Sequence, residues 1–393
     1  MLRNKSILLG VTGGVAAYKA VDLIRRLKDE GASVTVIMTE ASKNFITPLS
    51  LEVASHNKVY SGLFDTPIAH ITLTAEADIM VIAPATANII GKFARGIADD
   101  LLSTCLLSFN KKVVIAPAMN WRMYENPILQ ENLRHLISRG VIQVGPEKGS
   151  LACGEEGMGR MSEIPEIIEA IRSALSEKDL MKEKILVTAG PTREYLDPLR
   201  FISNRSSGKM GYAIARAAIR RGAEVTLISG PSLLSRPERV KFVSVETVVD
   251  MLNAVNRELP STTVLIMSAA VSDFTPAKMA KEKIEKSGEL LLRLSRTPDI
   301  ISEVGKKKDR PFIIGFAAEI GNKVRRAKEK LKEKNMDMII FNDVTEAGSG
   351  FDVDTNRVVI IDREKEIRLP LMSKDSVAEA ILDRLSELRR IDK

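Results

Sequence analysis

Residues 6–14 read Ser-Ile-Leu-Leu-Gly-Val-Thr-Gly-Gly, a short apolar run that ends in two glycines. Residues 6–11 of this run are predicted to form a buried strand, and residues 15–30 have the apolar spacing of a helix. The same alternation continues, with predicted strands at residues 32–38, 79–83 and 113–116 and predicted helices at residues 86–93, 97–108 and 127–139. Strands that alternate with helices predict a parallel sheet covered on both faces.

A second alternating series follows the charged stretch at residues 176–184, Ser-Glu-Lys-Asp-Leu-Met-Lys-Glu-Lys, which comes after a predicted helix at residues 163–175. It opens like the first series, with Leu186-Val-Thr-Ala-Gly-Pro-Thr192. Its predicted strands are residues 184–189, 224–229, 264–267, 312–315 and 338–341, and its predicted helices are residues 210–221, 247–259 and 323–334. We therefore expect two α/β domains, residues 1–182 and residues 183–393.

The composition is that of a soluble globular chain. Of 393 residues, 45% are hydrophobic and 28% are charged, which excludes a disordered or collagen-like protein. No apolar run is long enough for a membrane span, and the first residues do not have the pattern of a signal peptide. Two cysteines exclude a disulfide framework, and three histidines exclude a histidine-rich metal site. We therefore expect a cytoplasmic protein with no membrane partner.

The positive charge lies in the second half of the chain. Residues 1–182 hold 20 basic and 20 acidic side chains, whereas residues 183–393 hold 38 and 31, which accounts for the net charge of +7. A basic domain favours either nucleic acid or a small polyanion such as a nucleoside triphosphate. Aromatic residues make up only 4% of the chain, which leaves little for base stacking. We therefore expect a small polyanion and no nucleic acid.

Small polar residues follow the predicted strands of the first domain. Gly13 and Gly14 end the first strand, where free N–H groups at a helix start could bind a phosphate. A tight strand-to-helix turn is the simpler interpretation of this pair alone. Thr39 follows the second strand, and Thr86 and Asn88 follow the third. Because carboxyl ends of parallel strands meet at one edge of the sheet, these residues together predict a mononucleotide site.

Three further residues in the first domain are candidates for chemistry. His70 is an isolated histidine, which is more often structural than catalytic. Cys153 lies in Gly149-Ser-Leu-Ala-Cys-Gly-Glu-Glu-Gly-Met-Gly159, a composition typical of a mobile lid that carries a thiol. Asn120, in Pro117-Ala-Met-Asn-Trp-Arg-Met123, offers an amide after the fourth predicted strand.

These motifs resemble a known family. The first half resembles the flavin-dependent cysteine decarboxylases, specifically phosphopantothenoylcysteine decarboxylase. The segments that match are Gly13-Gly-Val-Ala-Ala-Tyr-Lys19, His70-Ile-Thr-Leu73, Ala83-Pro-Ala-Thr-Ala-Asn88, Pro117-Ala-Met-Asn120 and Ala152-Cys-Gly-Glu-Glu-Gly-Met-Gly-Arg160. The second half resembles its fused partner, phosphopantothenate–cysteine ligase. The matching segments are Thr188-Ala-Gly-Pro-Thr-Arg-Glu194, Arg200-Phe-Ile-Ser-Asn-Arg-Ser-Ser-Gly-Lys-Met-Gly211, Ala269-Ala-Val-Ser-Asp273 and Asn342-Asp343. The order is that of the bifunctional coenzyme A biosynthetic family.

The resemblance implies a flavodoxin-like or Rossmann-like first domain that binds FMN and releases CO2 from 4′-phosphopantothenoylcysteine to give 4′-phosphopantetheine. The FMN contacts would be Gly13, Gly14, Thr39, Thr86 and Asn88. Cys153 matches the proton donor of the last step, and His70 matches the histidine needed before decarboxylation. Asn120 matches the asparagine that binds the substrate.

The resemblance also implies a Rossmann-like second domain that joins L-cysteine to 4′-phosphopantothenate. CTP would form an acyl-cytidylate, with loss of pyrophosphate, before the cysteine amine attacks. Asn204 and Arg200 match positions that serve this intermediate. The nucleotide-binding positions would be Met267, Ser268, Ala269, Asp273, Lys283, Pro298, Asp299, Ile300, Ile301, Phe316, Lys330 and Lys334. Asp273 would serve the ribose or Mg²⁺, and the other charges of helix 323–334 would be solvated. Glu285 stands where relatives often carry another lysine.

The resemblance further implies a homo-oligomer in which flavin domains form trimers around shared FMN sites and ligase domains form dimers, together a dodecamer. A different class of protein, a flavin-binding electron carrier with a nucleotide-sensing module, remains an alternative. His70, Cys153 and Asn120 argue against it, because an electron carrier needs no such groups.

Overall fold

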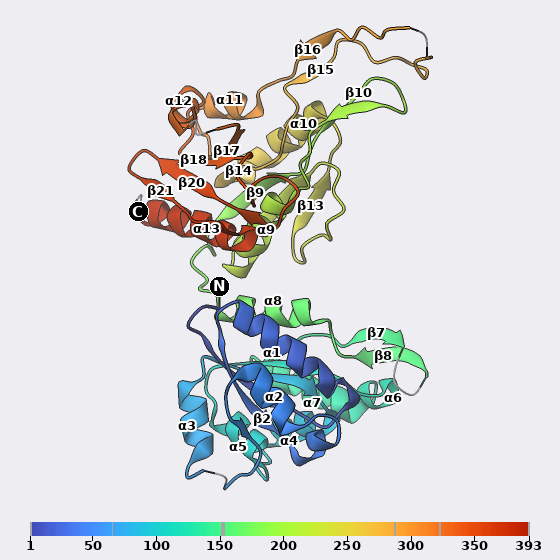
Figure 1. Ribbon diagram of the computed structural model, residues 1–393, viewed down its shortest axis with the longest axis vertical. Coiled ribbons are helices and arrows are strands. Elements are labelled where there is room, and N and C mark those ends of the chain that lie inside the picture. Colours follow the sequence, from blue (N-terminus) through green and yellow to red (C-terminus); the bar gives the residue numbers. More distant parts are fainter. Residues whose placement is uncertain (1, 65, 151–153, 287, 322–323, 392–393) are drawn as a thin grey trace. The chain divides into compact units, whose positions relative to one another are not determined.

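The computed structural model describes residues 2–64, 66–150, 154–286, 288–321 and 324–391. The chain forms two compact units, Met1–Ser176 and Glu177–Lys393 (Figure 1). The division falls inside the charged stretch at residues 176–184. Leu180, four residues after Ser176, is buried in the core of the second unit, and Asp179 pairs there with Arg221. The polar segment between the domains is therefore partly built into the second unit.

The first unit is built on a parallel sheet of six strands in the order β3-β2-β1-β4-β5-β6. The strands are β1 (Ser6–Val11), β2 (Ser33–Met38), β3 (Val59–Tyr60), β4 (Ile79–Ala85), β5 (Lys112–Pro117) and β6 (Ile142–Gln143). The order reverses between β1 and β4, and their carboxyl ends diverge there. In sheets of this kind, ligands bind at that point.

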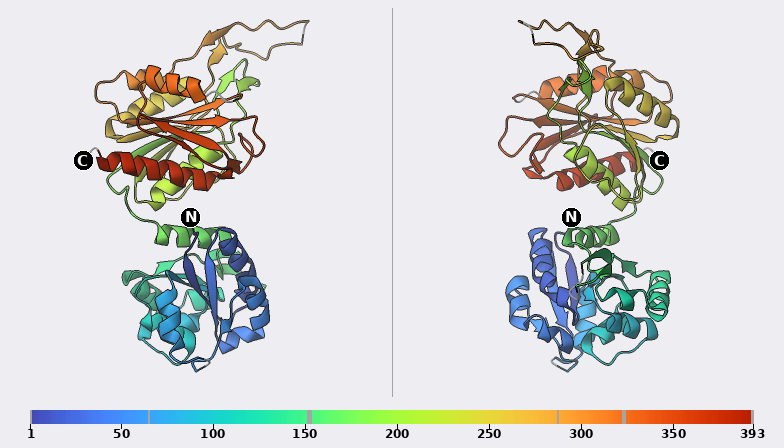
Figure 2. Two further views of the ribbon diagram at one scale, coloured as in Figure 1. Left: turned by 60° about the vertical axis from the view of Figure 1, so that its left-hand side comes forward. Right: turned by 90° about the vertical axis from the view of Figure 1, so that its right-hand side faces the viewer.

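Helices cover both faces of this sheet (Figure 2). Ile7, Leu9 and Val11 of β1 pack on one face, with α1 and α8, whereas Leu8 packs on the other face with α5. Burial on both faces explains why the strands are continuous apolar runs. The helices are η1 (Val15–Lys19), α1 (Ala20–Asp29), η2 (Glu40–Asn44), α2 (Pro48–Ser55), α3 (Ala69–Glu76), α4 (Ala87–Arg95), α5 (Leu101–Ser108), α6 (Trp121–Tyr124), α7 (Pro127–Ser138) and α8 (Ile164–Leu175).

The second unit repeats this strand order and extends it. Its sheet has the order β13-β12-β9-β14-β17-β18-β20-β21, and the first six of these strands are parallel. The last two are antiparallel. The strands are β9 (Lys184–Ala189), β12 (Glu224–Ser229), β13 (Lys241–Ser244), β14 (Val264–Met267), β17 (Phe312–Glu319), β18 (Met338–Asp343), β20 (Val358–Asp362) and β21 (Glu366–Arg368).

Two helices cover one face of the second sheet, α9 (Lys209–Arg220) and α13 (Lys374–Ile391). The other face is covered by α10 (Val248–Glu258), α11 (Ile300–Gly305) and α12 (Val324–Glu333), and η3 (Leu259–Ser261) follows α10. Arg384 of α13 is 2% exposed and makes a two-pronged contact with Asp362 at the end of β20, at 2.7 and 3.1 Å. This buried pair fixes α13 to the antiparallel edge of the sheet.

In the described ranges, four short pairs of strands lie outside the two sheets: β7 (Glu147–Ser150) with β8 (Glu156–Arg160), β10 (Arg193–Tyr195) with β11 (Phe201–Ser203), β15 (Phe274–Pro276) with β16 (Leu294–Arg296), and β19 (Thr355–Asn356) with β22 (Met372–Ser373). The chain between β15 and β16 projects from the second unit (Figure 1). Within the described part of the chain, no helix combines the length and apolarity needed to cross a membrane.

The structure confirms the predicted architecture of two α/β units with parallel sheets. The strands β1, β9, β12 and β14 have the predicted bounds. The sequence-based interpretation did not include α2, α3, α13 or the antiparallel edge of the second sheet.

Candidate functional site

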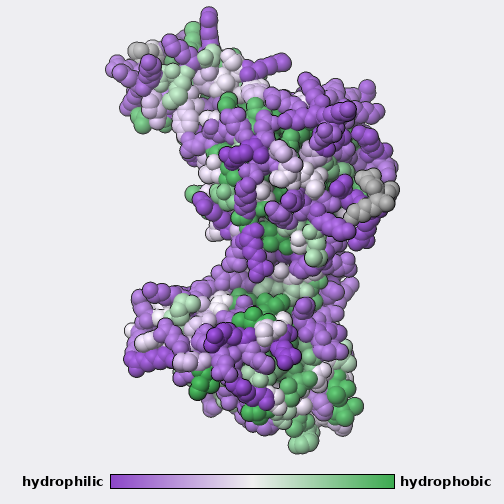
Figure 3. Space-filling view, turned by 180° about the vertical axis from the view of Figure 1, so that it is seen from behind, coloured by the Kyte–Doolittle hydropathy of each residue, from purple (hydrophilic) through white to green (hydrophobic). Residues whose placement is uncertain are grey.

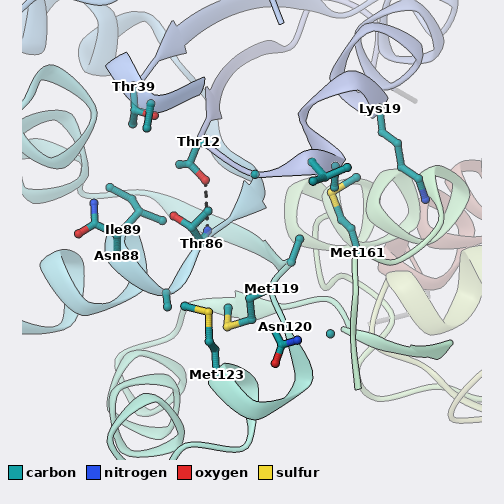
Figure 4. A pocket seen from close by; sticks show the side chains of 18 of the residues that line it. Thr12, Lys19, Thr39, Thr86, Asn88, Ile89, Met119, Asn120, Met123 and Met161 are labelled. Atoms are coloured by element: carbon teal, nitrogen blue, oxygen red, sulfur yellow. Dashed lines mark hydrogen bonds between the residues drawn. The ribbon is translucent and has the colours of Figure 1, made fainter. Parts of the chain in front are cut away.

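A cavity of about 950 Å³ lies at the carboxyl edge of the first sheet. It is lined by residues that follow β1, β2, β4 and β5, so it sits at the reversal of strand order between β1 and β4. The sequence-predicted residues Gly13, Gly14, Thr39, Thr86, Asn88 and Asn120 all line it. Figure 4 shows Thr39, Thr86, Asn88 and Asn120 around the cavity. The structure therefore brings together side chains from four separate segments of the sequence.

The two glycines have different roles. A Cβ atom at Gly13 would lie 2.5 Å from Cβ of Ala41 and 2.8 Å from its carbonyl carbon, so only glycine fits against this backbone. At Gly14, the nearest heavy atom to an added Cβ would be Cγ2 of Thr86 at 3.6 Å, an ordinary contact. The tight-turn interpretation therefore accounts for Gly13, whereas Gly14 faces a more open part of the cavity wall.

Three threonines shape the same wall. The hydroxyl of Thr12 donates to the carbonyl oxygen of Pro84 at 2.7 Å and accepts from the backbone N–H of Thr86 at 3.2 Å (Figure 4). The Oγ1 atom of Thr39 is buried, yet it has no hydrogen-bond partner among the described residues. Buried hydroxyls are almost always paired. The Thr39 hydroxyl therefore fits a site completed by a polar group of a bound ligand.

The hairpin β7–β8 packs closely on the segment around Asn120. The backbone N–H of Met119 donates to the carbonyl oxygen of Gly159 at 3.0 Å, and a Cβ at Gly159 would collide with the Met119 carbonyl. A Cβ at Gly157 would lie 2.6 Å from Cβ of Trp121. These two glycines permit the close packing of the hairpin on the segment around Asn120.

Polar contacts extend this packing. Glu155 accepts from Nε1 of Trp121 at 2.7 Å and from Nη2 of Arg122 at 2.8 Å. The side-chain oxygen of Asn120 caps α6 by accepting from the backbone N–H of Arg122 at 2.9 Å. This fixes the orientation of the Asn120 amide at the cavity wall. The predicted proton donor Cys153 lies outside the described residues.

Among the described residues of a single chain, His70 is not one of those that line this cavity. It lies half-buried in the first turn of α3, and its carbonyl oxygen accepts from Oγ1 of Thr74 at 2.6 Å and from Oγ of Ser108 at 3.3 Å. Because α3 starts after a loop and packs on α5, its histidine is held at the surface of the unit.

The charged residues that line this cavity were not among the predicted site residues. Lys92 pairs with Asp99 at 2.6 Å and with Asp100 at 2.7 Å. Burial opposes the charge of Lys92, but the hydrogen bonds that its ammonium donates to the two carboxylates outweigh this effect and raise the pKa of Lys92. Lys19 and Arg160, also on the wall, both pair with Glu163. The cations of this cavity are thus largely neutralised by neighbours.

A second cavity, of about 680 Å³, occupies the corresponding edge of the second sheet. It is lined by residues after β14, by β17, by the end of β18 and by the start of α9. Most of the predicted nucleotide-binding residues line it: Met267, Ser268, Ala269, Asp273, Pro298, Asp299, Ile300, Ile301, Phe316, Lys330 and Lys334. These residues come from four segments that are distant in sequence, residues 267–273, 298–301, 316 and 330–334.

The second cavity is basic. Among the described residues, five basic side chains line it, Lys209, Arg296, Lys330, Lys334 and Lys374, against the two carboxylates Asp273 and Asp299. Lys330 pairs with Glu319 at 2.7 Å, and Lys334 pairs with Asp299 at 2.8 Å. Burial opposes ionisation of Asp299, but the hydrogen bond from Lys334 outweighs it and lowers the pKa of that carboxyl. Such a site favours a polyanionic ligand.

Three of the predicted residues are not among the described residues that line this cavity: Arg200, Asn204 and Lys283. The Nδ2 group of Asn204 donates to the carbonyl oxygen of Ala270, a wall residue, at 2.8 Å. Arg200 donates to the carbonyl oxygen of Ile284 at 2.9 Å, which places it beside the backbone that carries Lys283. Lys283 itself is exposed on the projecting chain between β15 and β16.

Comparison with known proteins agrees with this division. A family model described as Flavoprotein matches residues 1–176, and one described as DNA/pantothenate metabolism flavoprotein C-terminal domain matches residues 180–388. The fold, the two cavities and these matches define a flavoprotein unit fused to a second α/β unit.

Individual relatives extend over the whole chain. The Coenzyme A biosynthesis bifunctional protein CoaBC of Vibrio cholerae is 44% identical, with 98% of this chain and 99% of the relative covered. The protein of the same name from Escherichia coli K12 is 45% identical, with 98% and 97% covered. A solved structure of the C-terminal domain of a CoaBC protein is 41% identical and covers 55% of this chain and 99% of its own, with a TM-score of 0.48. The chain therefore belongs to the family of coenzyme A biosynthesis bifunctional proteins, which confirms the resemblance found in the sequence.

Proposed function

We propose that the chain is a cytoplasmic enzyme with two activities, phosphopantothenate–cysteine ligase and phosphopantothenoylcysteine decarboxylase. The second unit would join L-cysteine to 4′-phosphopantothenate at the expense of CTP. The first would convert the product, 4′-phosphopantothenoylcysteine, to 4′-phosphopantetheine and CO2. The observation that carries this proposal is the presence of two cavities of different chemistry, each at the strand-order reversal of its own sheet, in a chain of this family.

FMN fits the first cavity, because the buried Thr39 hydroxyl lacks a partner among the described residues and the open wall at Gly14 leaves room for a ligand group. We assign Gly13, Gly14, Thr39, Thr86 and Asn88 to its binding. FMN supplies two-electron redox chemistry for the substrate thiol, which gives the departing carboxylate an electron sink. Asn120, fixed by its cap on α6, would hold the substrate carboxylate or amide. Cys153 would donate the proton that completes the product.

His70 would act in this site through a neighbouring copy of the chain. The surface around α3 and α5 exposes the apolar side chains Phe64, Ile68, Ile71 and Leu107, and apolar residues gather on the first unit in Figure 3. A patch of this kind is typical of an interface. Burial of this face in a trimer of first units would place His70 beside the cavity of a neighbour, while the second units would pair as dimers.

The oligomer is tested by charging the apolar face. Ile71→Asp should dissociate the trimers of first units and abolish decarboxylation, because each cavity would lose the histidine of its neighbour. Sedimentation and CO2 release measure the two effects. Leu233→Asp, on an exposed leucine of the second unit, serves as the control. Full decarboxylation by a monomeric Ile71→Asp protein would rule out a shared site.

CTP would occupy the second cavity, with Lys330 and Lys334 on its phosphates and Phe316 near its base. Within the described ranges, no cluster of three or more acidic, histidine or cysteine side chains could hold a metal ion. Mg²⁺ commonly binds through one or two carboxylates and substrate phosphates. Mg²⁺ would therefore enter with the triphosphate, and Asp273 is its proposed protein ligand.

The acyl-cytidylate and its conversion would involve Asn204, Arg200 and Lys283. Asp197 anchors this region, because its carboxylate accepts from the backbone N–H groups of Arg200 and Ile284 at 2.8 and 3.1 Å. The segment that carries Lys283 is thereby attached, directly beside Lys283, to the loop that carries Asp197 and Arg200. We propose that this segment delivers the Lys283 ammonium to the triphosphate.

The ligase assignment is tested with neighbouring exposed lysines. Lys283→Gln should lower ligation strongly and leave decarboxylation near the wild-type rate, since a charge-assisted phosphate contact is lost in one unit only. Lys281→Gln is the matched control and should change neither activity. Ligation that releases a nucleoside diphosphate and phosphate, in place of CMP and pyrophosphate, would contradict the acyl-cytidylate route.

A further inference from the structure

A buried lysine lies at the wall of the second cavity outside the predicted nucleotide contacts. Lys374, the first residue of α13, is 6% exposed. Its ammonium donates to three backbone carbonyl oxygens, those of Val353 at 2.6 Å, Gly350 at 2.9 Å and Phe351 at 3.2 Å. All three acceptors belong to residues 350–354, which we call the wall loop.

The wall loop is also tied to the start of α9. Oγ of Ser207 donates to the carbonyl oxygen of Phe351 at 2.7 Å. Nζ of Lys209 donates to the carbonyl oxygen of Asp352 at 2.9 Å and pairs with the carboxylate of Asp354 at 2.7 Å. Ser207, Lys209 and Phe351 line the second cavity. The shape of this part of the wall therefore depends on the conformation of the wall loop.

Several groups oppose a charged side chain at Lys374. A helix start disfavours positive charge, and burial removes an ammonium from water. Burial and the neighbouring ammonium of Lys209 lower the pKa of Lys374 to about 8, against the opposing effect of Asp354 and Asp352. An apolar side chain at position 374 could fill the same space without the cost of burying an ammonium. An ammonium does offer three N–H donors, one for each carbonyl of the wall loop.

We propose that Lys374 is a positioning residue for the ligase reaction, whose ammonium holds the wall loop against the start of α9 and so keeps the second cavity shaped for its substrates. This inference rests on the proposed ligase function. Lys374 also lines the cavity, but the inference assigns it no contact with a substrate. Its effect passes through Phe351 and Ser207, which line the same cavity.

A positioning role and a purely structural role predict different kinetics. If Lys374 served only folding, its loss would reduce the folded fraction, so kcat per total protein would fall while every KM stayed constant. If it positions the wall loop, the folded variant binds a ligase substrate in a distorted cavity. The KM of that substrate then rises even when the amount of folded protein is corrected for.

The experiment uses the full chain and measures KM and kcat of ligation for CTP, 4′-phosphopantothenate and L-cysteine. Lys374→Met removes the donors and keeps the length of the side chain. It should raise the KM of at least one of these substrates by about ten-fold or more, because small displacements of a binding wall are costly. Lys374→Arg retains charge and donors and should recover most of this loss. Lys308→Met, on an exposed lysine of the same unit, should match the wild type.

Ser207→Ala removes a second tie to the wall loop and should raise the KM of the same substrate to a smaller extent. If Lys374→Met does not fold, Ser207→Ala and Lys374→Arg decide the question. A folded Lys374→Met or Ser207→Ala protein with wild-type KM values for all three substrates would overturn the inference. A wild-type chain without ligation would instead overturn the proposed function itself.

Discussion

The two cavities occupy equivalent positions in two sheets of the same strand order, yet their walls differ. Three basic and two acidic residues line the first cavity, and its cations Lys92 and Lys19 are held by carboxylates. Five basic and two acidic residues line the second. The shared topology decides where a ligand binds, and the side chains after each strand decide which ligand it is.

The strongest test of this comparison separates the two units. Fragments 1–176 and 177–393 follow the compact units of the structure. The first should bind FMN and decarboxylate supplied 4′-phosphopantothenoylcysteine without any ligation, and the second should ligate without any decarboxylation. Assays of both fragments for CO2 and pyrophosphate measure the outcome. Retention of both activities by one fragment would break the assignment of one activity to each cavity.

A second test compares Gly13 with Gly14. Gly13→Ala should weaken FMN binding by about ten-fold or more, because the new methyl group would force the backbone of Ala41 away from the cavity and overpacking of this kind costs about 1–3 kcal/mol. Gly14→Ala has space and should have a smaller effect. Flavin fluorescence titration measures both affinities. An equal loss at the two positions would show that the ligand itself approaches Gly14 as closely as Ala41 approaches Gly13.

A third test concerns the charge of the second cavity. Lys330→Gln should raise the KM for CTP by about ten-fold, since a charge-assisted contact with the triphosphate is lost. The KM of the variant should also depend less on salt than that of the wild type, because screening acts on fewer charges. Steady-state kinetics at two salt concentrations measure both effects, and FMN retention serves as the control. A wild-type KM that does not change with salt would contradict the electrostatic reading of this cavity.

The smallest expected effect is at Thr39. Thr39→Val replaces a buried hydroxyl that has no partner among the described residues, so the flavin-free protein should become more stable by about 1 kcal/mol. The FMN-bound protein should gain less, because the variant loses a contact with the ligand. Thermal unfolding with and without FMN separates these effects. Equal stabilisation of both forms would mean that FMN does not use this hydroxyl.

The sequence predicted those parts of the fold that local pattern determines. The run Ser6–Val11 is buried on both faces, and its bounds follow from apolar residues alone. Helix α13 was missed although Val377, Ile381 and Leu385 have helical spacing and are buried, because the interpretation of the second series stopped at the parallel strands. The antiparallel β20 resembles the other apolar runs, and its direction depends on a tertiary pairing with β18.

The site residues that directly follow a strand could be predicted from the sequence. Thr39, Thr86 and Asn120 follow apolar strands, and the strand-end rule brings them together. Lys374 lies far along the chain from Ser207, and no spacing in the sequence connects them. The position of His70 away from the cavity of its own chain also depends on how α3 packs on α5.

The contact between Gly157 and Trp121 has a consequence for how this segment can vary among relatives. The indole fills the space that a side chain at position 157 would need. The two positions should therefore change together: a residue larger than glycine at 157 is expected only in relatives with glycine at 121 or a displaced backbone there, because the nearest clashing atom is Cβ of Trp121. Alanine scanning of this hairpin would also mark Gly157 as essential, and that result would report lost packing rather than lost chemistry.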